Sequence, residues 1–258
     1  MAVFITFGLM KQTTTYGLVG RRLGHSFSRQ FFSAMFAAND IDAHYLNFEL
    51  PDIGDLMEML AEYDSLRGFN VTVPYKELIL PYLDKVSPEV TEIGAANVVK
   101  VVHRDGDIFL KGYNTDLDGF AKSLHPRLTP DMRSALVLGS GGASKAVVCG
   151  LRRLGIEPLV VSRTPRDGMI GYDDITAELI DRCRLIVNAT PLGMFPDVDS
   201  CPHLPYNLLD NRHLCYDLVY NPAQTLFMRR AAASGASVCN GLEMLMIQAF
   251  ESWHIWNS

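Results

Sequence analysis

A glycine-rich turn between an apolar run and an amphipathic stretch is the feature that most restricts the fold of this chain. The apolar run ends at residues 136–138, the turn occupies residues 139–144 with the sequence Gly-Ser-Gly-Gly-Ala-Ser, and residues 145–154 follow with helical apolar spacing. This order predicts a strand, a tight turn and a helix. In such a turn Gly139 permits the bend and Gly141 lets backbone N–H groups approach a pyrophosphate, which the positive end of the helix dipole attracts.

A glycine pattern by itself also describes an ordinary flexible loop, so the neighbouring elements decide between the two interpretations. A second apolar run, residues 159–161, follows at the distance expected of a βαβ unit and favours dinucleotide binding. After that run an NAD site places an acidic residue on the ribose 2′-hydroxyl, whereas this chain has Ser162, Arg163 and Thr164. A guanidinium flanked by hydroxyls favours a 2′-phosphate, and therefore NADP(H), unless Arg163 is only a solvated loop cation.

The composition is that of a folded globular protein and argues against several classes of partner. Of 258 residues, 48% are hydrophobic and 20% charged, which allows one large domain or two of ordinary size. The net charge of −6 without a Lys/Arg run argues against nucleic acid as a partner, and no stretch approaches the ~20 apolar residues of a membrane span. Five cysteines without a Cys-x-x-Cys spacing suit reduced thiols in a cytoplasm, and the scattered histidines predict no metal site.

Polar side chains of the first half of the chain stand where strands and helices are expected to meet. Ser26 and Ser28, on a loop that enters a helix, can direct two hydroxyls at an oxygen-rich ligand; alternatively, Ser28 is the helix N-cap and Ser26 is merely exposed. A later strand reaches Thr72 and ends at Pro74, which places Lys76 in the first turn of a helix. The helix dipole disfavours a cation there, and this mismatch indicates a function for the lysine.

Three further polar residues mark element ends later in the chain. Asn97 precedes a strand, and Asp116 ends the next one unless it is the N-cap of a helix that begins at Leu117. Alternating strands and helices predict that this half is also α/β. A last helix over residues 241–256 is expected, with Gln248 on the flank of an apolar stripe that consists of Leu242, Leu245, Met246, Ala249, Phe250 and Trp253. Because no partner pattern precedes Thr15, we expect residues 1–9 to be dispensable.

Several of these motifs, in order, resemble the substrate-site motifs of the shikimate dehydrogenase family. The motifs are Gly24-His25-Ser26-Phe27-Ser28, Asn70-Val71-Thr72-Val73-Pro74-Tyr75-Lys76, Gly94-Ala95-Ala96-Asn97 and Asn114-Thr115-Asp116. In the second half Asn188-Ala189-Thr190-Pro191 is similar to the family segment beside the nicotinamide, and Tyr220 follows a strand similar to the family's next one. The resemblance runs from about Tyr16 to the C-terminus. The family usually has an asparagine before the arginine, where this chain has Ser162. This difference affects the expected contacts with the adenine or the phosphate.

The resemblance implies two α/β domains and a dehydrogenase reaction. Residues 1–118 plus 241–258 would form the substrate domain, to which the C-terminal helix returns, and residues 119–240 a Rossmann-type NADP-binding domain. The implied reaction is the NADPH-dependent, reversible reduction of 3-dehydroshikimate to shikimate in aromatic amino-acid biosynthesis, by a cytoplasmic monomer or homodimer. Two alternatives are a quinate or dual quinate/shikimate dehydrogenase and a non-catalytic nucleotide-binding homologue. Retention of both Lys76 and Asp116 argues against the last.

The same resemblance assigns roles to single residues. The expected catalytic pair is Lys76, whose ammonium donates a proton to the developing alkoxide, and Asp116, whose carboxylate orients it. The residues expected to bind substrate are Ser26, Ser28, Thr72, Asn97, Thr115, Tyr220 and Gln248. Those expected to bind NADP(H) are Gly139, Ser140, Gly141, Gly142, Ala143, Ser162, Arg163, Thr164, Asn188, Thr190 and Gly241.

Overall fold

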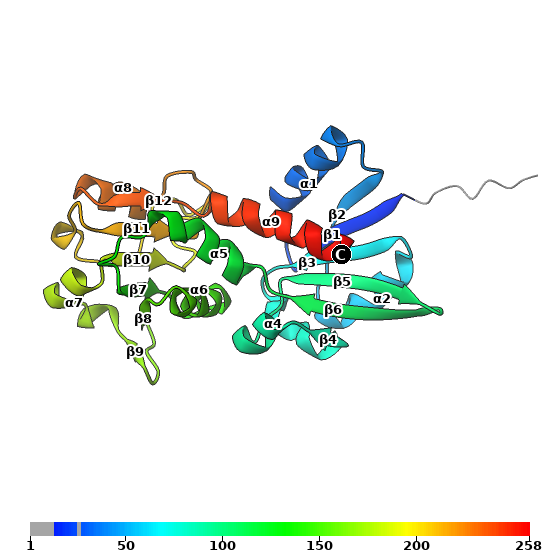
Figure 1. Cartoon of the computed structure of the whole chain (residues 1–258), viewed down its shortest axis with the longest axis horizontal. Coiled ribbons are helices and arrows are strands. Elements are labelled where there is room, and N and C mark those ends of the chain that lie inside the picture. The colour runs from blue at the N-terminus through cyan, green and yellow to red at the C-terminus, as the bar shows by residue number, and fades with distance from the viewer. Residues whose placement is uncertain (1–12, 25–26) are drawn as a thin grey trace, which may run out of the picture. The chain divides into compact units, whose positions relative to one another are not determined.

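The computed structural model describes residues 13–24 and 27–258 and consists of two units, each built on a six-stranded sheet (Figure 1). The first unit comprises the described residues up to Val86, together with Ala96–Gly112 and Ser258. The second comprises Ser87–Ala95 and Tyr113–Asn257. Ser26 and residues 1–9 lie outside the described residues, so the expectations about them stay predictions.

The sheet of the first unit is mixed, with the strand order β2-β1-β3-β5-β6-β4. β1 pairs in parallel with β2 and β3, whereas β3 pairs with β5 in antiparallel fashion. Asp105 and Gly106, both at positive φ, form a two-residue turn between β5 and β6, as primed hairpin turns require. The strands are β1 (Thr14–Gly20), β2 (Ala43–Glu49), β3 (Leu66–Val71), β4 (Lys85–Val86), β5 (Val98–Arg104) and β6 (Asp107–Tyr113). The helices are α1 (Phe27–Ala38), α2 (Leu56–Glu62) and α3 (Tyr75–Leu78), with 3₁₀ turns η1 (Ile53–Asp55) and η2 (Leu80–Tyr82).

Two helices of the first unit differ from the sequence-based expectation. In α1, Phe32 and Phe36 are buried one turn apart, and the ring of Phe32 stacks on Tyr45 at 4.7 Å between centroids. Because α1 begins at Phe27, Ser28 lies inside its first turn, and its expected role as N-cap was wrong. The helix that carries Lys76 is a single turn of four residues. In a helix of one turn the first turn is also the last, so the helix dipole does not disfavour a cation at Lys76. The mismatch expected from the sequence is therefore absent.

The sheet of the second unit is parallel throughout, with the order β12-β11-β10-β7-β8-β9. Its chain order reverses at β7, which lies between β8 and β10, and such a reversal opens a crevice at the carboxyl ends of the strands. The strands are β7 (Ser134–Leu138), β8 (Glu157–Val161), β9 (Met169–Ile170), β10 (Leu185–Asn188), β11 (Leu214–Asp217) and β12 (Ser237–Cys239). The helices are α4 (Pro88–Ile93), α5 (Asp116–Leu124), α6 (Gly142–Arg153), α7 (Ala177–Arg182), α8 (Leu226–Ala233) and α9 (Leu242–Asn257), with 3₁₀ turns η3 (His125–Arg127), η4 (Tyr172–Asp174) and η5 (Tyr206–Leu208).

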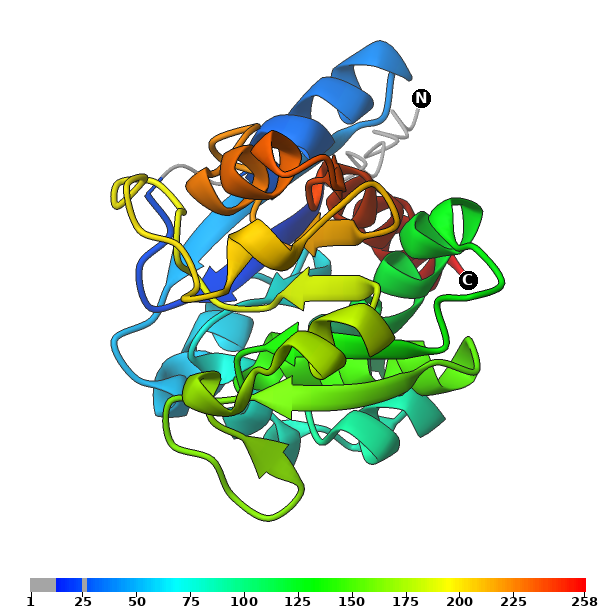
Figure 2. The same cartoon turned by 90° about the vertical axis from the view of Figure 1, so that its left-hand side faces the viewer.

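Helices cover both faces of this parallel sheet, and Figure 2 shows them on either side of the strands. Along β7, Ala135 and Val137 belong to a core cluster shared with α5, α6 and α9, whereas Leu136 and Leu138 belong to a cluster shared with α7 and α8. Strands buried on both faces read as continuous apolar runs, which is why this strand could be recognised from sequence. The expected Rossmann-type α/β unit is confirmed.

Helix α9 differs in part from its predicted pattern. Its buried side chains are Met244, Ala249, Ser252 and Trp256, whereas Leu242, Met246 and Phe250, three members of the expected stripe, are 40–47% exposed. The helix is apolar on nearly all sides, so periodicity alone does not select its buried face. Its contacts with α5 group α9 with the second unit, whereas the sequence analysis assigned it to the substrate domain. The return of this helix to the substrate domain stays a prediction.

The described residues contain neither a membrane-spanning helix nor a cluster of metal ligands. None of the helices over residues 13–24 and 27–258 combines the length and apolar character that crossing a bilayer requires. Within the same residues, no three His, Cys, Asp or Glu side chains gather as metal ligands.

Candidate functional site

The glycine turn of the second unit has the geometry expected of a phosphate-binding turn. Gly139 has φ +109°, and a Cβ there would lie 2.9 Å from Cγ2 of Thr190, so only glycine fits. Gly141 is the N-cap of α6, and a Cβ on it would meet no atom within 4 Å. The space in front of this twelve-residue helix is therefore open, and the free N–H groups of its first turn can donate to an anion.

A pocket of about 470 Å³ lies at the carboxyl ends of β7, β8 and β10, within the second unit. We call it the glycine-turn pocket. Seven of the residues predicted to bind cofactor line it: Gly139, Ser140, Gly141, Ser162, Arg163, Thr164 and Thr190. None of the described residues that line it is acidic. Tyr172, Cys201 and His203 also line it and were not predicted, because they belong to segments without a recognisable motif.

Ser162 holds the loop that presents Arg163 to this pocket. Its hydroxyl lies 3.1 Å from that of Ser140 and accepts a hydrogen bond from the backbone N–H of Thr164. Ser162 is only 4% exposed. The serine that departs from the family pattern therefore still ties the glycine turn to the arginine loop.

Asn188 does not line the glycine-turn pocket, because it is fully buried. Its amide donates to Asp217 at 2.9 Å, and its oxygen accepts from both the backbone N–H and the hydroxyl of Thr190. Asp217 also accepts from Thr225 and from the backbone of Val219. Burial raises the pKa of Asp217 to about 6 against the opposing effect of these hydrogen bonds. These bonds fit the alternative interpretation of Asn188, in which it fixes the turn at Thr190 by hydrogen bonding. Its expected contact with the cofactor stays a prediction.

Three other residues of the predicted cofactor set do not line the pocket either. Gly142 and Ala143 are the first residues of α6, where their backbone N–H groups belong to the free first turn. Gly241 lies directly before α9, and a Cβ on it would come within 2.2 Å of the carbonyl oxygen of Leu218. Close packing of two backbones explains this glycine without a ligand.

In the first unit, two predicted substrate residues, Ser28 and Asn97, belong to one hydrogen-bonded network with Tyr45 and Asn70. The hydroxyl of Tyr45 donates to Asn70 at 2.8 Å and is hydrogen-bonded to Ser28. Burial raises the pKa of this tyrosine, and the bond to Ser28 opposes the rise. The Asn70 amide and the Val71 N–H both donate to the carbonyl of Asn97. Tyr45 was not predicted from the sequence, because only the fold brings the Tyr45 hydroxyl of β2 to Asn70 of β3.

Thr72 follows β3 directly and approaches β1. A Cβ on Gly20 would lie 2.8 Å from Cγ2 of Thr72, and the backbone N–H of Thr72 donates to Val19. Thr72, Ser28 and Asn97 therefore lie near the carboxyl end of β3 in the first unit.

The two predicted catalytic residues are held by backbone contacts in their own units. Lys76 lies half-buried in α3 of the first unit, and its carbonyl accepts from the N–H of Ala96 at 2.8 Å. Asp116 of the second unit is 4% exposed and is the first residue of α5, so the alternative that it is the N-cap was wrong. Its N–H donates to Asn114, whose amide donates to the carbonyl of Ala95.

Three predicted substrate residues belong to the second unit. Thr115 is buried directly before α5 and makes no side-chain capping bond. Tyr220 is half-buried, and burial raises its pKa. Gln248 packs across α5, since a Cβ on Gly119 would lie 2.7 Å from its Cγ.

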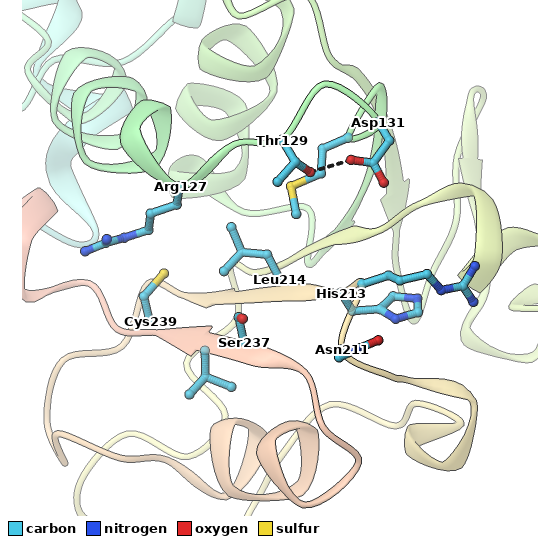
Figure 3. A pocket seen from close by; sticks show the side chains of 11 residues that line it. Arg127, Thr129, Asp131, Asn211, His213, Leu214, Ser237 and Cys239 are labelled. Atoms are coloured by element: carbon cyan, nitrogen blue, oxygen red, sulfur yellow. Dashed lines mark hydrogen bonds between the residues drawn. The ribbon is translucent and has the colours of Figure 1, made fainter.

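A second pocket, of about 480 Å³, lies at the amino ends of β7, β11 and β12 (Figure 3). Its charged side chains already have partners: Arg127 pairs with Glu243 at 2.6 Å, and Figure 3 shows the hydroxyl of Thr129 bound to Asp131. His213 bonds Asp210 and the carbonyl of Ile180. Ligands of parallel sheets bind at the carboxyl ends of the strands, so the glycine-turn pocket is the candidate site.

The chain is similar to known proteins over most of its length. The family model described as the shikimate dehydrogenase substrate binding domain matches residues 18–99. A curated relative from Desulforamulus reducens, named shikimate dehydrogenase (NADP(+)), is 35% identical over 95% of this chain and 90% of its own.

Two solved structures are also similar. One is the shikimate 5-dehydrogenase of Thermus thermophilus in complex with NADP(H) and shikimate, with TM-score 0.81, 34% identity and coverage of 94% of this chain and 93% of that one. The other is the Listeria monocytogenes enzyme in complex with shikimate and NAD, with TM-score 0.82, 28% identity and coverage of 98% and 94%.

Proposed function

The chain belongs to the shikimate dehydrogenase family, and from that premise we infer that it catalyses the NADPH-dependent, reversible reduction of 3-dehydroshikimate to shikimate. This is an oxidoreductase step of aromatic amino-acid biosynthesis. The observation that carries the cofactor assignment is the glycine-turn pocket, where Arg163 stands beside the glycine turn and no acidic residue is present among the described lining residues. An acidic residue would repel a 2′-phosphate, whereas a guanidinium binds it.

The residues of the glycine-turn pocket fit a dinucleotide. Gly141 and the first turn of α6 would hold the pyrophosphate, because a side chain at that glycine would occupy the open space in front of the helix. Arg163 would hold the 2′-phosphate, and Thr190, fixed by Asn188, would lie toward the nicotinamide half. When bound, NADPH supplies the hydride, so the protein has to orient the ketone and manage one proton.

We propose that Lys76 manages this proton. Its ammonium donates to the oxygen of the ketone as negative charge develops there, and the Asp116 carboxylate favours the charged lysine and directs it. Ser28, Thr72 and Asn97 of the first unit bind hydroxyl and carboxylate groups of the substrate. Ser26, Thr115, Tyr220 and Gln248 complete the proposed substrate contacts.

Location and assembly follow from the same reasoning. All five cysteines are free thiols, which suits the reducing cytoplasm where we place the enzyme. We propose a monomer or a homodimer, which light scattering of the purified protein would distinguish.

Initial rates with shikimate and with quinate, each with NADP and with NAD, test the proposed function. We expect the highest kcat/KM for shikimate with NADP. A preference for quinate, or equal rates for the two acids, would assign the chain to the quinate or dual-specificity enzymes. No turnover of either acid by the folded protein would favour a nucleotide-binding homologue without catalytic function.

A further inference from the structure

An unusual connection brings Tyr172 to the wall of the glycine-turn pocket. β8 and β9 pair in parallel although only residues 162–168 join them, and no helix lies between. Parallel neighbours ordinarily need a crossover of about a dozen residues or more. Here the short loop carries Arg163, and the chain after β9 turns at once into η4, where the N–H of Gly171 bonds the Asp174 side chain at 2.8 Å.

The environment of Tyr172 combines a fixed ring with an available hydroxyl. The ring packs against the core cluster that includes Leu138 and Val161, the last residues of β7 and β8. Tyr172 and Arg163 both line the glycine-turn pocket. Burial raises the pKa of Tyr172, and the positive charge of Arg163 opposes the rise. Within residues 13–24 and 27–258, the hydroxyl of Tyr172 has no hydrogen-bond partner.

We propose that Tyr172 is a specificity-determining residue for NADP(H), with its hydroxyl donating a hydrogen bond to the 2′-phosphate that Arg163 binds and its ring covering the adenosine. A neutral phenol is a suitable second donor, because a phosphate oxygen accepts several hydrogen bonds and those to charged acceptors are the stronger ones. The ring adds an apolar wall that does not distinguish NADP from NAD. This inference deepens the proposed function and rests on NADP(H) binding in the glycine-turn pocket.

The test separates the hydroxyl from the ring with two ligands that lack nicotinamide. Calorimetry gives the Kd of adenosine 2′,5′-bisphosphate and of 5′-AMP for the wild type, Tyr172→Phe and Tyr172→Ala. For Tyr172→Phe we expect about tenfold or more weaker binding of the bisphosphate and a Kd for AMP within about twofold of wild type. Tyr172→Ala should weaken both ligands, because it removes the wall as well.

Two further variants make the result decisive. Tyr216→Phe removes another tyrosine hydroxyl of the same unit, one that bonds Ser123 and lines no part of the glycine-turn pocket, and should leave both Kd values unchanged. If Arg163→Ala loses the bisphosphate preference and Tyr172→Phe keeps it, the inference about Tyr172 is overturned and the cofactor assignment stands. If the wild type binds the bisphosphate no better than AMP, the inference about Tyr172 and the assignment of NADP(H) as cofactor are both overturned.

Discussion

Lys76 carries the most direct test of the proposed chemistry at the residue scale. General acid catalysis contributes typically ~10²–10⁴-fold, so Lys76→Met should lower kcat by about that factor while the Kd for shikimate changes little. Single-turnover rates and equilibrium titration measure the two quantities separately. Lys85→Met, which changes an exposed lysine of β4, is the control. A kcat close to that of the wild type would remove Lys76 from the role.

Arg163 carries the corresponding test for the cofactor. Loss of hydrogen bonds to a charged group is worth about 1.5–3 kcal/mol, so Arg163→Ala should weaken NADPH by roughly tenfold or more and leave NADH nearly unaffected. Fluorescence titration of both reduced cofactors measures this, with Arg152→Ala at the exposed end of α6 as the control. Equal losses for NADPH and NADH would contradict a contact to the 2′-phosphate.

Single residues differ in how well their places could be predicted. Gly139 and Arg163 were found from sequence because a turn motif specifies local backbone geometry, and local geometry is encoded by neighbours in the chain. Asn188 was assigned to the cofactor, yet its environment depends on Asp217 in the next strand, and only pairing of β10 with β11 brings the two together. The position of Tyr172 in the pocket could not be predicted from the sequence, because it depends on β8 and β9 being joined without a helix between them.

At the scale of elements, the junction of β10 and β11 predicts a pH effect on stability. Burial raises the pKa of Asp217 from 3.8 to about 6 in the folded protein. The folded state therefore holds this proton more tightly than the unfolded chain, and the stability it contributes is complete below pH 4 and lost as the pH rises through about 6. From this group, the free energy of unfolding should fall by on the order of 2–3 kcal/mol between pH 4 and 7.

Urea unfolding of the wild type and Asp217→Asn at pH 4 and pH 7 measures this effect. The stability of the variant relative to the wild type should rise with pH, because the amide cannot ionise. Asp173→Asn, which changes an exposed carboxylate of η4, is the control for general charge effects. A difference between variant and wild type that does not change with pH would show that Asp217 is already ionised at pH 4.

Elements were predicted best where their burial pattern is simple. Strands β7 and β10 of the second unit are buried on both faces and appear as continuous apolar runs. Helix α9 is the opposite case, because apolar residues occur on nearly every side of it, and its buried face follows from the neighbouring α5. The four-residue α3 is too short for periodicity to define, although its motif around Lys76 was recognised.

At the scale of the whole molecule, the cofactor contacts of the glycine-turn pocket belong to the second unit alone. A ligand stabilises the state that binds it, by about 2.7 kcal/mol at a hundred times its Kd. Amide hydrogen exchange reports that stabilisation segment by segment. Saturating NADP should therefore slow exchange in β7, β10 and α6 more than in β1 and β3 of the first unit. NAD at the same concentration and the Arg163→Ala variant serve as controls, both with weaker protection. Equal protection of β1 and β3 would contradict this prediction, because it would mean that the two units defined by their internal contacts unfold together.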